Sequence, residues 1–221
     1  GWSWRRLYFS HRGAAIDPRR GATCGVCATL PVMPGDPARR EATYAELEAL
    51  PRHVVGEILY GVLHAFPRPR IRHARAASRL GVSLGPAFDR GHPGPGGWIL
   101  LDEPELHLGR DVLVPDLAGW RRERLPELPD EAYFTLAPDW VCEVLSPTTR
   151  AVDLTDKRDI YLRERVEHLW LVDPAPEACT LEVLRWSERG YVVVASHRGD
   201  AVVEAPPFEA VPLELGALWE R

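Results

Sequence analysis

The most informative stretch of the chain is Ala-Pro-Asp-Trp-Val-Cys-Glu-Val-Leu-Ser-Pro-Thr-Thr-Arg, residues 137–150. Its centre is a short apolar run between two prolines, which is typical of a buried strand at residues 140–145. Glu143 interrupts this run, and side-chain alternation turns it to the same face as Val141 and Leu145. A carboxylate among apolar neighbours costs desolvation energy unless a partner compensates it. Glu143 therefore marks either a buried ion pair or a functional site.

A second acid, Asp116, ends the β-branched run at residues 112–117, which we also expect to form a strand. If this strand neighbours that of Glu143, the two carboxylates can converge on one point. Two such oxygen ligands, helped by a backbone carbonyl and waters, are how proteins hold Mg²⁺ against phosphate substrates. The pair is a candidate metal site.

Lys157 is the only lysine among 27 basic residues, all the others being arginine. Lysine is a compact point charge whose pKa responds to burial, whereas arginine is a wide and permanently charged fork. A helix predicted from Asp153 to about Arg165 places Asp153, Lys157 and Tyr161 on one face, from which the ammonium can point at the two acids. The alternative is an ordinary exposed pair of Asp153 with Lys157, worth only tenths of a kcal/mol.

The remaining patterns predict a mixed α/β domain with a core sheet covered by helices. Thr43 and Glu46 form a capping box that starts a short helix, and helical spacing recurs over residues 71–84. We expect a loop at residues 91–97, and extended segments over residues 54–66 turning at Gly61. Further strands are predicted at residues 98–101, 168–172, 181–186 and 191–196.

Composition limits the possible classes of protein. Apolar residues make up 45% and charged residues 27% of the 221 positions, and no apolar run approaches the ~18 residues of a membrane span. The first six residues lack the apolar part of a secretory signal, so we expect no membrane association and a cytoplasmic location.

The charge is unevenly distributed along the chain. Residues 1–40 hold seven Arg and two Asp, a net charge of +5. Because the whole chain has a net charge of −5, the remaining residues carry −10. An acidic body requires a local basic groove or a metal ion to bind a polyanion.

Residues 1–40 are rich in Arg, Gly and Pro and are predicted to be an irregular extension preceding one domain over residues 41–221. Cys24 and Cys27 have the spacing of half a zinc site, but no second pair follows at a suitable distance. We expect the four cysteines to be reduced thiols.

Several of these motifs, taken in order, resemble one known family. They are Val114-Pro-Asp116-Leu, the stretch 137–150, the helix positions Asp153, Lys157 and Tyr161, and Val166-Glu-His-Leu-Trp-Leu-Val-Asp-Pro174. Together they are similar to the Uma-two family of restriction endonucleases, within the PD-(D/E)XK nuclease superfamily. The resemblance covers roughly residues 43–215 and, upstream of these motifs, includes Glu57, Gly61 and His73. The sequence differs from the superfamily pattern at Leu145, where lysine is usual, and at Tyr60, where the family often has Asp.

The resemblance implies a restriction-endonuclease-like core, a central mixed sheet flanked by helices. It implies Asp116 and Glu143 as metal ligands and Lys157 as the catalytic lysine. Glu57, His73 and Tyr161 are possible accessory residues.

The implied activity is hydrolysis of DNA phosphodiester bonds by water bound to Mg²⁺, for which Mn²⁺ should substitute. A homodimer would supply two sites for a duplex. The alternative is a catalytically inactive module of the same fold that binds DNA or protein and keeps these residues as structural ion pairs.

Overall fold

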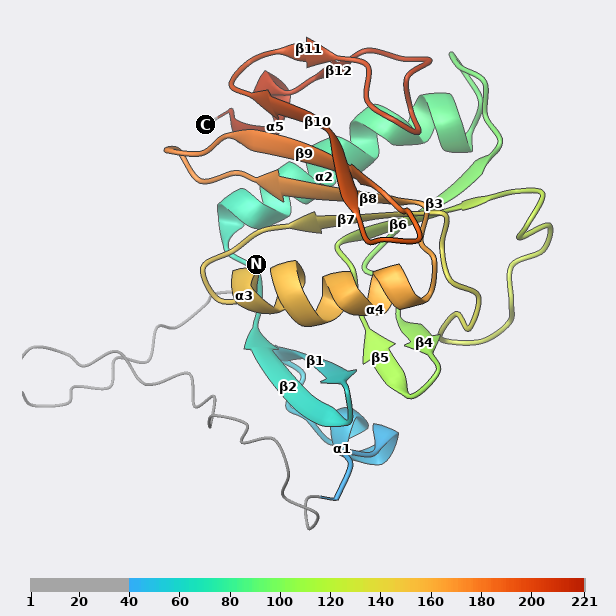
Figure 1. The fold of residues 1–221 in the computed structure, drawn as a ribbon, viewed down its shortest axis with the longest axis vertical. Coiled ribbons are helices and arrows are strands. Elements are labelled where there is room, and N and C mark those ends of the chain that lie inside the picture. The colour runs from blue at the N-terminus through green and yellow to red at the C-terminus, as the bar shows by residue number, and fades with distance from the viewer. Residues whose placement is uncertain (1–39, 221) are drawn as a thin grey trace, which may run out of the picture. The chain divides into compact units, whose positions relative to one another are not determined.

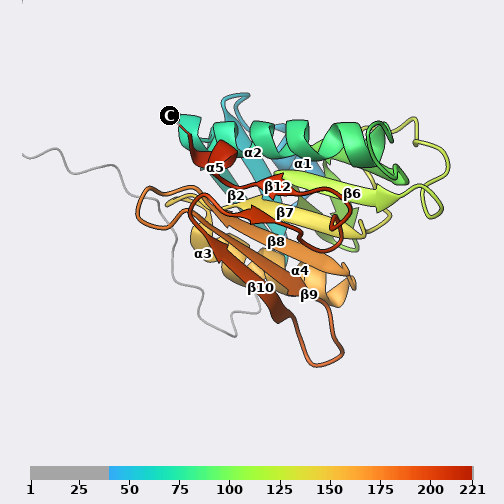
Figure 2. The same ribbon diagram turned by 90° about the horizontal axis from the view of Figure 1, so that it is seen from above.

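The computed structural model describes residues 40–220, which belong to one compact unit. Three layers are visible in Figures 1 and 2: a central sheet with helix α2 on one face and helices α3 and α4 on the other. A smaller sheet lies beside the second face, at the bottom of Figure 1. The helical elements are α1 (Tyr44–Glu48), α2 (Ile71–Leu84), η1 (Gly85–Asp89), α3 (Arg150–Val152), η2 (Asp153–Lys157), α4 (Arg158–Arg163) and α5 (Gly216–Trp219).

The strands form three sheets. The central sheet has the order β10-β9-β8-β7-β6-β3, the small sheet β2-β1-β5-β4, and β11 pairs with β12. Their bounds are β1 (Val54–Leu59), β2 (Val62–Pro67), β3 (Trp98–Asp102), β4 (Leu106–Leu108), β5 (Asp111–Leu113), β6 (Leu117–Arg121), β7 (Trp140–Val144), β8 (His168–Asp173), β9 (Thr180–Arg185), β10 (Val192–Arg198), β11 (Val202–Val203) and β12 (Leu213–Glu214).

The central sheet is mixed because β7 and β8 are parallel while the other neighbours are antiparallel. A parallel pair needs a crossover, and the continuous helical stretch α3-η2-α4 supplies it. All five residues of β7 and all six of β8 are buried, as expected for strands covered on both faces. The predicted fold, a central mixed sheet flanked by helices, is confirmed.

The face towards α2 is packed with aromatic rings. Phe208 contacts the rings of Trp98, Trp140 and Trp170 at centroid distances of 4.9, 4.9 and 5.6 Å. Between them, Gly119 has no room for a side chain, since a Cβ atom there would lie 2.8 Å from Leu100 and 3.2 Å from Trp140. This face is the larger apolar core of the domain.

The hairpin of β1 and β2 turns at Tyr60 and Gly61, both with positive φ (50° and 75°). Two such residues between antiparallel strands form the tight turn that matches strand twist. Tyr60 is therefore compatible with the turn, and its N–H donates to Asp111 Oδ1 at 2.6 Å. That bond ties the hairpin to β5, which also pairs with β1.

Most predicted elements are confirmed. Thr43 and Glu46 cap α1 reciprocally, α2 spans residues 71–84, and residues 91–97 form neither helix nor strand. The predicted continuous strand over 112–117 is wrong. It divides at Val114-Pro115-Asp116 into β5 of the small sheet and β6 of the central sheet, because Pro115 has no N–H to continue a ladder.

Two smaller differences concern the crossover and the minor elements. The helical stretch begins at Arg150, not at Asp153, and includes the π-helical turn η2. The short elements β4, β11, β12 and α5 carry too little periodic pattern to be predicted. Within residues 40–220 no helix has the length and hydrophobicity needed to cross a bilayer. Cys24, Cys27 and nearly all of the predicted extension lie outside the described residues.

Candidate active site

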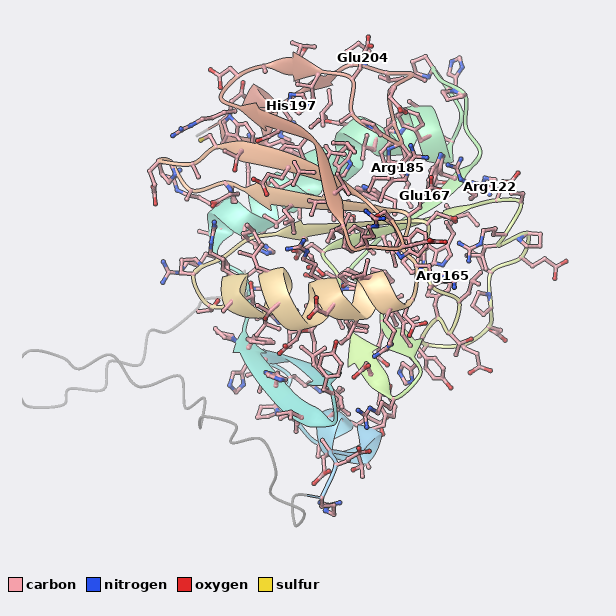
Figure 3. All side chains as sticks on the ribbon, viewed as in Figure 1. Arg122, Arg165, Glu167, Arg185, His197 and Glu204 are labelled. Carbon is pink, nitrogen blue, oxygen red and sulfur yellow. The ribbon has the colours of Figure 1, made fainter. Side chains whose placement is uncertain are left out.

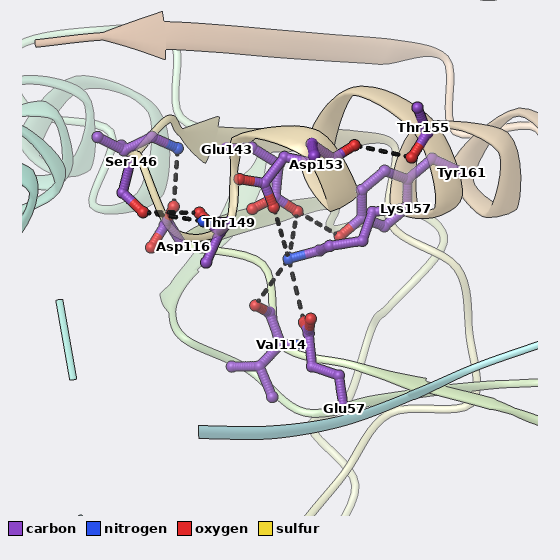
Figure 4. Close-up of polar contacts among 12 residues, drawn as sticks. Glu57, Val114, Asp116, Glu143, Ser146, Thr149, Asp153, Thr155, Lys157 and Tyr161 are labelled. Carbon is purple, nitrogen blue, oxygen red and sulfur yellow. Dashed lines mark hydrogen bonds and ion pairs between the residues drawn. The ribbon is translucent and has the colours of Figure 1, made fainter. Parts of the chain in front are cut away.

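Strands β6 and β7 bring Asp116 and Glu143 together. Leu117 pairs with Cys142 in this antiparallel ladder, so one step further along the register places Asp116 opposite Glu143. Alternation along β7 turns Glu143 away from the aromatic core and towards the helical stretch α3-η2-α4. In Figure 4 Glu143 lies beside Asp153 and Lys157, and Asp116 lies to the left, beside Ser146 and Thr149.

Asp116 is held in place by two donors. Its Oδ2 accepts a hydrogen bond of 2.7 Å from the N–H of Val144 and lies 3.2 Å from Nε2 of His73. His73 comes from the first turn of α2, so helices on both faces of the central sheet contribute side chains to the site. The His73 pKa is raised: burial lowers it, but the hydrogen bond and charge of Asp116 outweigh burial.

Lys157 is buried at the centre of the group, with 4% of its side chain exposed. Its Nζ lies 2.9 Å from Glu143 Oε1, 3.1 Å from Glu57 Oε1 and 3.7 Å from Asp153 Oδ1. It also donates to the backbone oxygen of Val114 at 3.2 Å. An exposed pair of Asp153 with Lys157 is therefore wrong, because both side chains are buried.

The Tyr161 hydroxyl and the N–H of Val114 orient two of the carboxylates around Lys157. The Tyr161 hydroxyl donates to Glu143 Oε1 at 2.6 Å, and the N–H of Val114 donates to Glu57 Oε1 at 2.8 Å. Because Val114 lies in the linker between β5 and β6, this bond joins β1 of the small sheet to the site. The three carboxylates around Lys157 in Figure 4 thus come from three separate elements: Glu57 from β1, Glu143 from β7 and Asp153 from η2.

A cavity of about 60 Å³ adjoins these groups. Its lining includes the hydroxyls of Ser146, Thr148 and Thr149, which bond to one another at 2.9 Å through Ser146 Oγ. The charged or titratable members of the lining are Glu57, His73, Glu103, Asp116, Glu143, Asp153 and Lys157.

Carboxylates outnumber cations in this buried group, which the pKa values reflect. Burial raises the pKa of Glu143 well above its usual value, although Lys157 opposes this. Burial likewise raises the pKa of Asp153, to about 6. For Lys157, burial alone would lower the pKa, but Glu143 and Glu57 outweigh it and raise the pKa well above the usual value. Lys157 is therefore a charged ammonium in this state.

Whether the site fits a divalent cation depends on the free carboxylate oxygens. Among the described residues, no three His, Cys, Asp or Glu side chains could hold a metal ion by themselves. Asp116 and Glu143 each use one oxygen in the contacts above, which leaves Asp116 Oδ1 and Glu143 Oε2 beside a cavity with excess negative charge. Mg²⁺ commonly binds through one or two carboxylates plus waters and substrate phosphate. The donor set fits that mode and not a closed protein cage.

The six residues singled out from sequence lie in one region: five line the cavity, and Tyr161 bonds to Glu143. Sequence reasoning missed the contribution of Asp153 beyond its spacing from Lys157. It also missed the backbone oxygen of Val114 and the hydroxyls of residues 146–149. Only Asp153 had a usable signal, its position on the same helix face as Lys157 and Tyr161.

Comparisons with known proteins agree with this geometry. Residues 42–216 match the Uma2 family, described as "Putative restriction endonuclease". The fold is similar to the crystal structure of a "putative nuclease belonging to DUF820" from Anabaena variabilis ATCC 29413, with a TM-score of 0.62 and 22% identity over 79% of this chain and 94% of that one. No curated protein matches the sequence. Since the family match spans most of the chain, the protein belongs to the Uma2 family, the Uma-two family that its motifs resemble.

Proposed function

We propose that this protein is a metal-dependent endonuclease that hydrolyses phosphodiester bonds of DNA. The observation that carries the proposal is the burial of the only lysine against Glu143 and Glu57, on the rim of a cavity that Asp116 also lines. An ion pair kept only for stability gains little from such burial, since apolar residues of similar volume often serve as well. Membership of a restriction endonuclease family supports the same reaction class.

Asp116 and Glu143 are the proposed ligands of a Mg²⁺ ion, with Mn²⁺ able to substitute. When bound, such an ion supplies Lewis acidity towards phosphate and lowers the pKa of water. His73 and the N–H of Val144 orient Asp116, while Tyr161 and Lys157 orient Glu143. These contacts fix both carboxylates before substrate arrives, which reduces the reorganisation needed during reaction.

Lys157 is proposed to stabilise negative charge on the phosphate and to orient the attacking water. Its raised pKa keeps it protonated, which favours a role as cation and donor over one as general base. A guanidinium at this position would be wider than the ammonium and would not fit a cavity of about 60 Å³ without displacing its neighbours.

The test is cleavage of supercoiled plasmid in Mg²⁺ and in Mn²⁺ by the wild type, Asp116→Asn and Lys157→Arg. We expect nicking by the wild type and a loss of about 100-fold or more in each variant. Arg158→Gln is the matched control, because it removes a cation at the next position of the same helix without touching the carboxylates. The control should cleave at the wild-type rate.

The alternative is a module that binds DNA or protein without cleaving it. It is favoured by Glu143 Oε1 already contacting both Tyr161 and Lys157, as in a closed structural ion pair. A folded wild type that binds DNA and nicks nothing in either metal would establish this alternative and refute the endonuclease.

Cleavage of both strands of a duplex would require two such sites in symmetric relation, for which we propose a homodimer acting in the cytoplasm. Light scattering of the full chain with and without DNA measures this. A monomer in both conditions would exclude concerted cleavage by a dimer.

A further inference from the structure

A broad groove opens beside the candidate active site. Its volume is about 1010 Å³, compared with about 60 Å³ for the site cavity. Pro69, His73 and Ser146 line both spaces, so the groove continues from the cavity. A ligand that places one phosphate at the cavity has a continuous path along the groove.

The start of helix α2 gives this groove a positive wall. Arg70 and Arg72 line it, and both are exposed. No ion pair joins either of them to an acid within residues 40–220. The surrounding segment, residues 58–88, contains five arginines and no Asp or Glu, although the whole chain has a net charge of −5. This basic segment is the local exception in an acidic domain.

The acids of the groove do not cancel this charge. Asp173 ion-pairs with Arg150 and accepts a hydrogen bond of 3.0 Å from the N–H of Ala175, so that pair contributes no net charge. Glu177 is the only other acid of the lining. Arg70 and Arg72 leave the groove with a net positive charge.

Backbone N–H groups add further donors at the same place, beside the buried His73. The 14-residue helix α2 has no side-chain cap at Arg70, so the first N–H groups of the helix lack intrahelical partners and its N-terminus carries partial positive charge. His73 is 7% exposed and its Nδ1 has no hydrogen-bond partner in the described structure. Uncapped helix N-termini flanked by arginine suit phosphate groups.

The groove offers little for recognising bases. Its lining contains no Phe, Tyr or Trp on which an unpaired base could stack. The whole 221-residue chain also contains no Asn and no Gln, the side chains that bind adenine edges bidentately. The groove therefore lacks side chains that stack on bases or read adenine. Its arginines can bind either phosphate or guanine, and their place beside an uncapped helix N-terminus favours phosphate.

We infer that this groove binds the sugar–phosphate backbone of duplex DNA next to the scissile phosphate, through Arg70 and Arg72 and without base selection. The inference rests on the proposed function, because it assigns the path of the substrate into the same site. Phosphate contacts of this kind position a duplex without reading its sequence.

The test is binding of the full chain to labelled duplexes in EDTA, measured by fluorescence anisotropy over a series of salt concentrations. One duplex contains only A·T pairs and the other only G·C pairs. The double variant Arg70→Gln, Arg72→Gln is compared with the wild type and with Arg185→Gln. Arg185 is 61% exposed and lies at the right-hand end of the sheet in Figure 3, away from α3 and the site.

Loss of two phosphate contacts should make the salt dependence shallower by about 1.8 in the slope of log K against log salt. From about 50 to about 200 mM salt, the wild type should lose about 12-fold more affinity than the double variant. The change should be the same on both duplexes, and Arg185→Gln should keep the wild-type slope.

An unchanged slope in the double variant, a change confined to one duplex, or a wild type without salt-dependent binding overturns the inference. Plasmid cleavage by the same preparations separates it from the proposed function. A wild type that cleaves while the double variant keeps its slope refutes the groove alone. A shallower slope with no cleavage by the wild type refutes the nuclease alone and leaves the groove as a DNA-binding surface.

Discussion

The two faces of β7 differ in what their side chains contribute. Trp140, Cys142 and Val144 point into the apolar core against α2, whereas Val141 and Glu143 point towards the helical crossover. The first face stabilises the fold through aromatic packing. On the second face Glu143 meets Glu57 and Asp153, so that three buried carboxylates surround one ammonium, an arrangement that is electrostatically costly in isolation.

This difference places aromatic packing and the proposed chemistry on opposite faces of one strand of five residues. Changes on the aromatic face should alter folding and leave the chemistry of the folded fraction intact. Changes of the proposed metal ligands on the charged face should do the reverse. The proposed roles on the charged face depend on this separation, because it allows loss of activity to be distinguished from loss of structure.

The largest effect is expected for Glu143→Gln. Removing the charge while keeping the shape should reduce plasmid nicking by about 10³-fold, because a proposed ligand becomes neutral. The free energy of unfolding should change by less than about 1 kcal/mol, since Glu57 and Asp153 remain near Lys157. Nicking assays and urea unfolding measure the two quantities, and a variant that cleaves at the wild-type rate would remove Glu143 from the mechanism.

On the opposite face, Phe208→Ala should lower the free energy of unfolding by about 3–5 kcal/mol. The Phe208 ring is 1% exposed and contacts three tryptophans. Phe208→Leu, which leaves a smaller void, should cost about 1–2 kcal/mol. At a temperature where Phe208→Ala is folded, its rate of cleavage per folded molecule should equal that of the wild type; a large loss there would break the separation of the two faces.

Asp153→Asn tests the electrostatic cost of the charged face. The pKa of Asp153 is raised from 3.8 to about 6, first by burial. Between these values the unfolded carboxyl ionises before the folded one, so Asp153 contributes stability at low pH that is lost as pH rises. Relative to Asp153→Asn, the free energy of unfolding of the wild type should fall by about 2–3 kcal/mol between pH about 4 and about 6.5. Urea unfolding of both proteins in the absence of metal measures this difference. Parallel stability curves for the two proteins would contradict this.

The smallest effect is expected for Tyr161→Phe. The variant removes one hydrogen bond to Glu143, while Lys157 continues to hold the same oxygen. Stability should fall by about 1–2 kcal/mol, and nicking by less than about 10-fold. A loss as large as that of Glu143→Gln would mean that Tyr161 has a direct part in the reaction.

Prediction from sequence succeeded where a pattern is local. Helix α2 and the alternation of β7 follow from residue spacing, so Val141 and Glu143 are correctly assigned to one face. The unique lysine and the isolated acids led to the candidate site, because charges inside apolar segments are costly and need an explanation. Prediction failed at residues 112–117, where the change from one sheet to another depends on pairing partners distant in the chain.

By itself, therefore, the sequence determined the order of the longer elements, the face of β7 on which Glu143 lies, and the candidate residues Asp116, Glu143 and Lys157. Only the tertiary structure decided which carboxylates surround the ammonium, adding Glu57 from β1 and Asp153 from η2. It also decided that Arg70 and Arg72 border a groove continuous with the site. The reason is that periodicity reports which way a side chain faces, whereas the distance between two side chains depends on how separate elements pack.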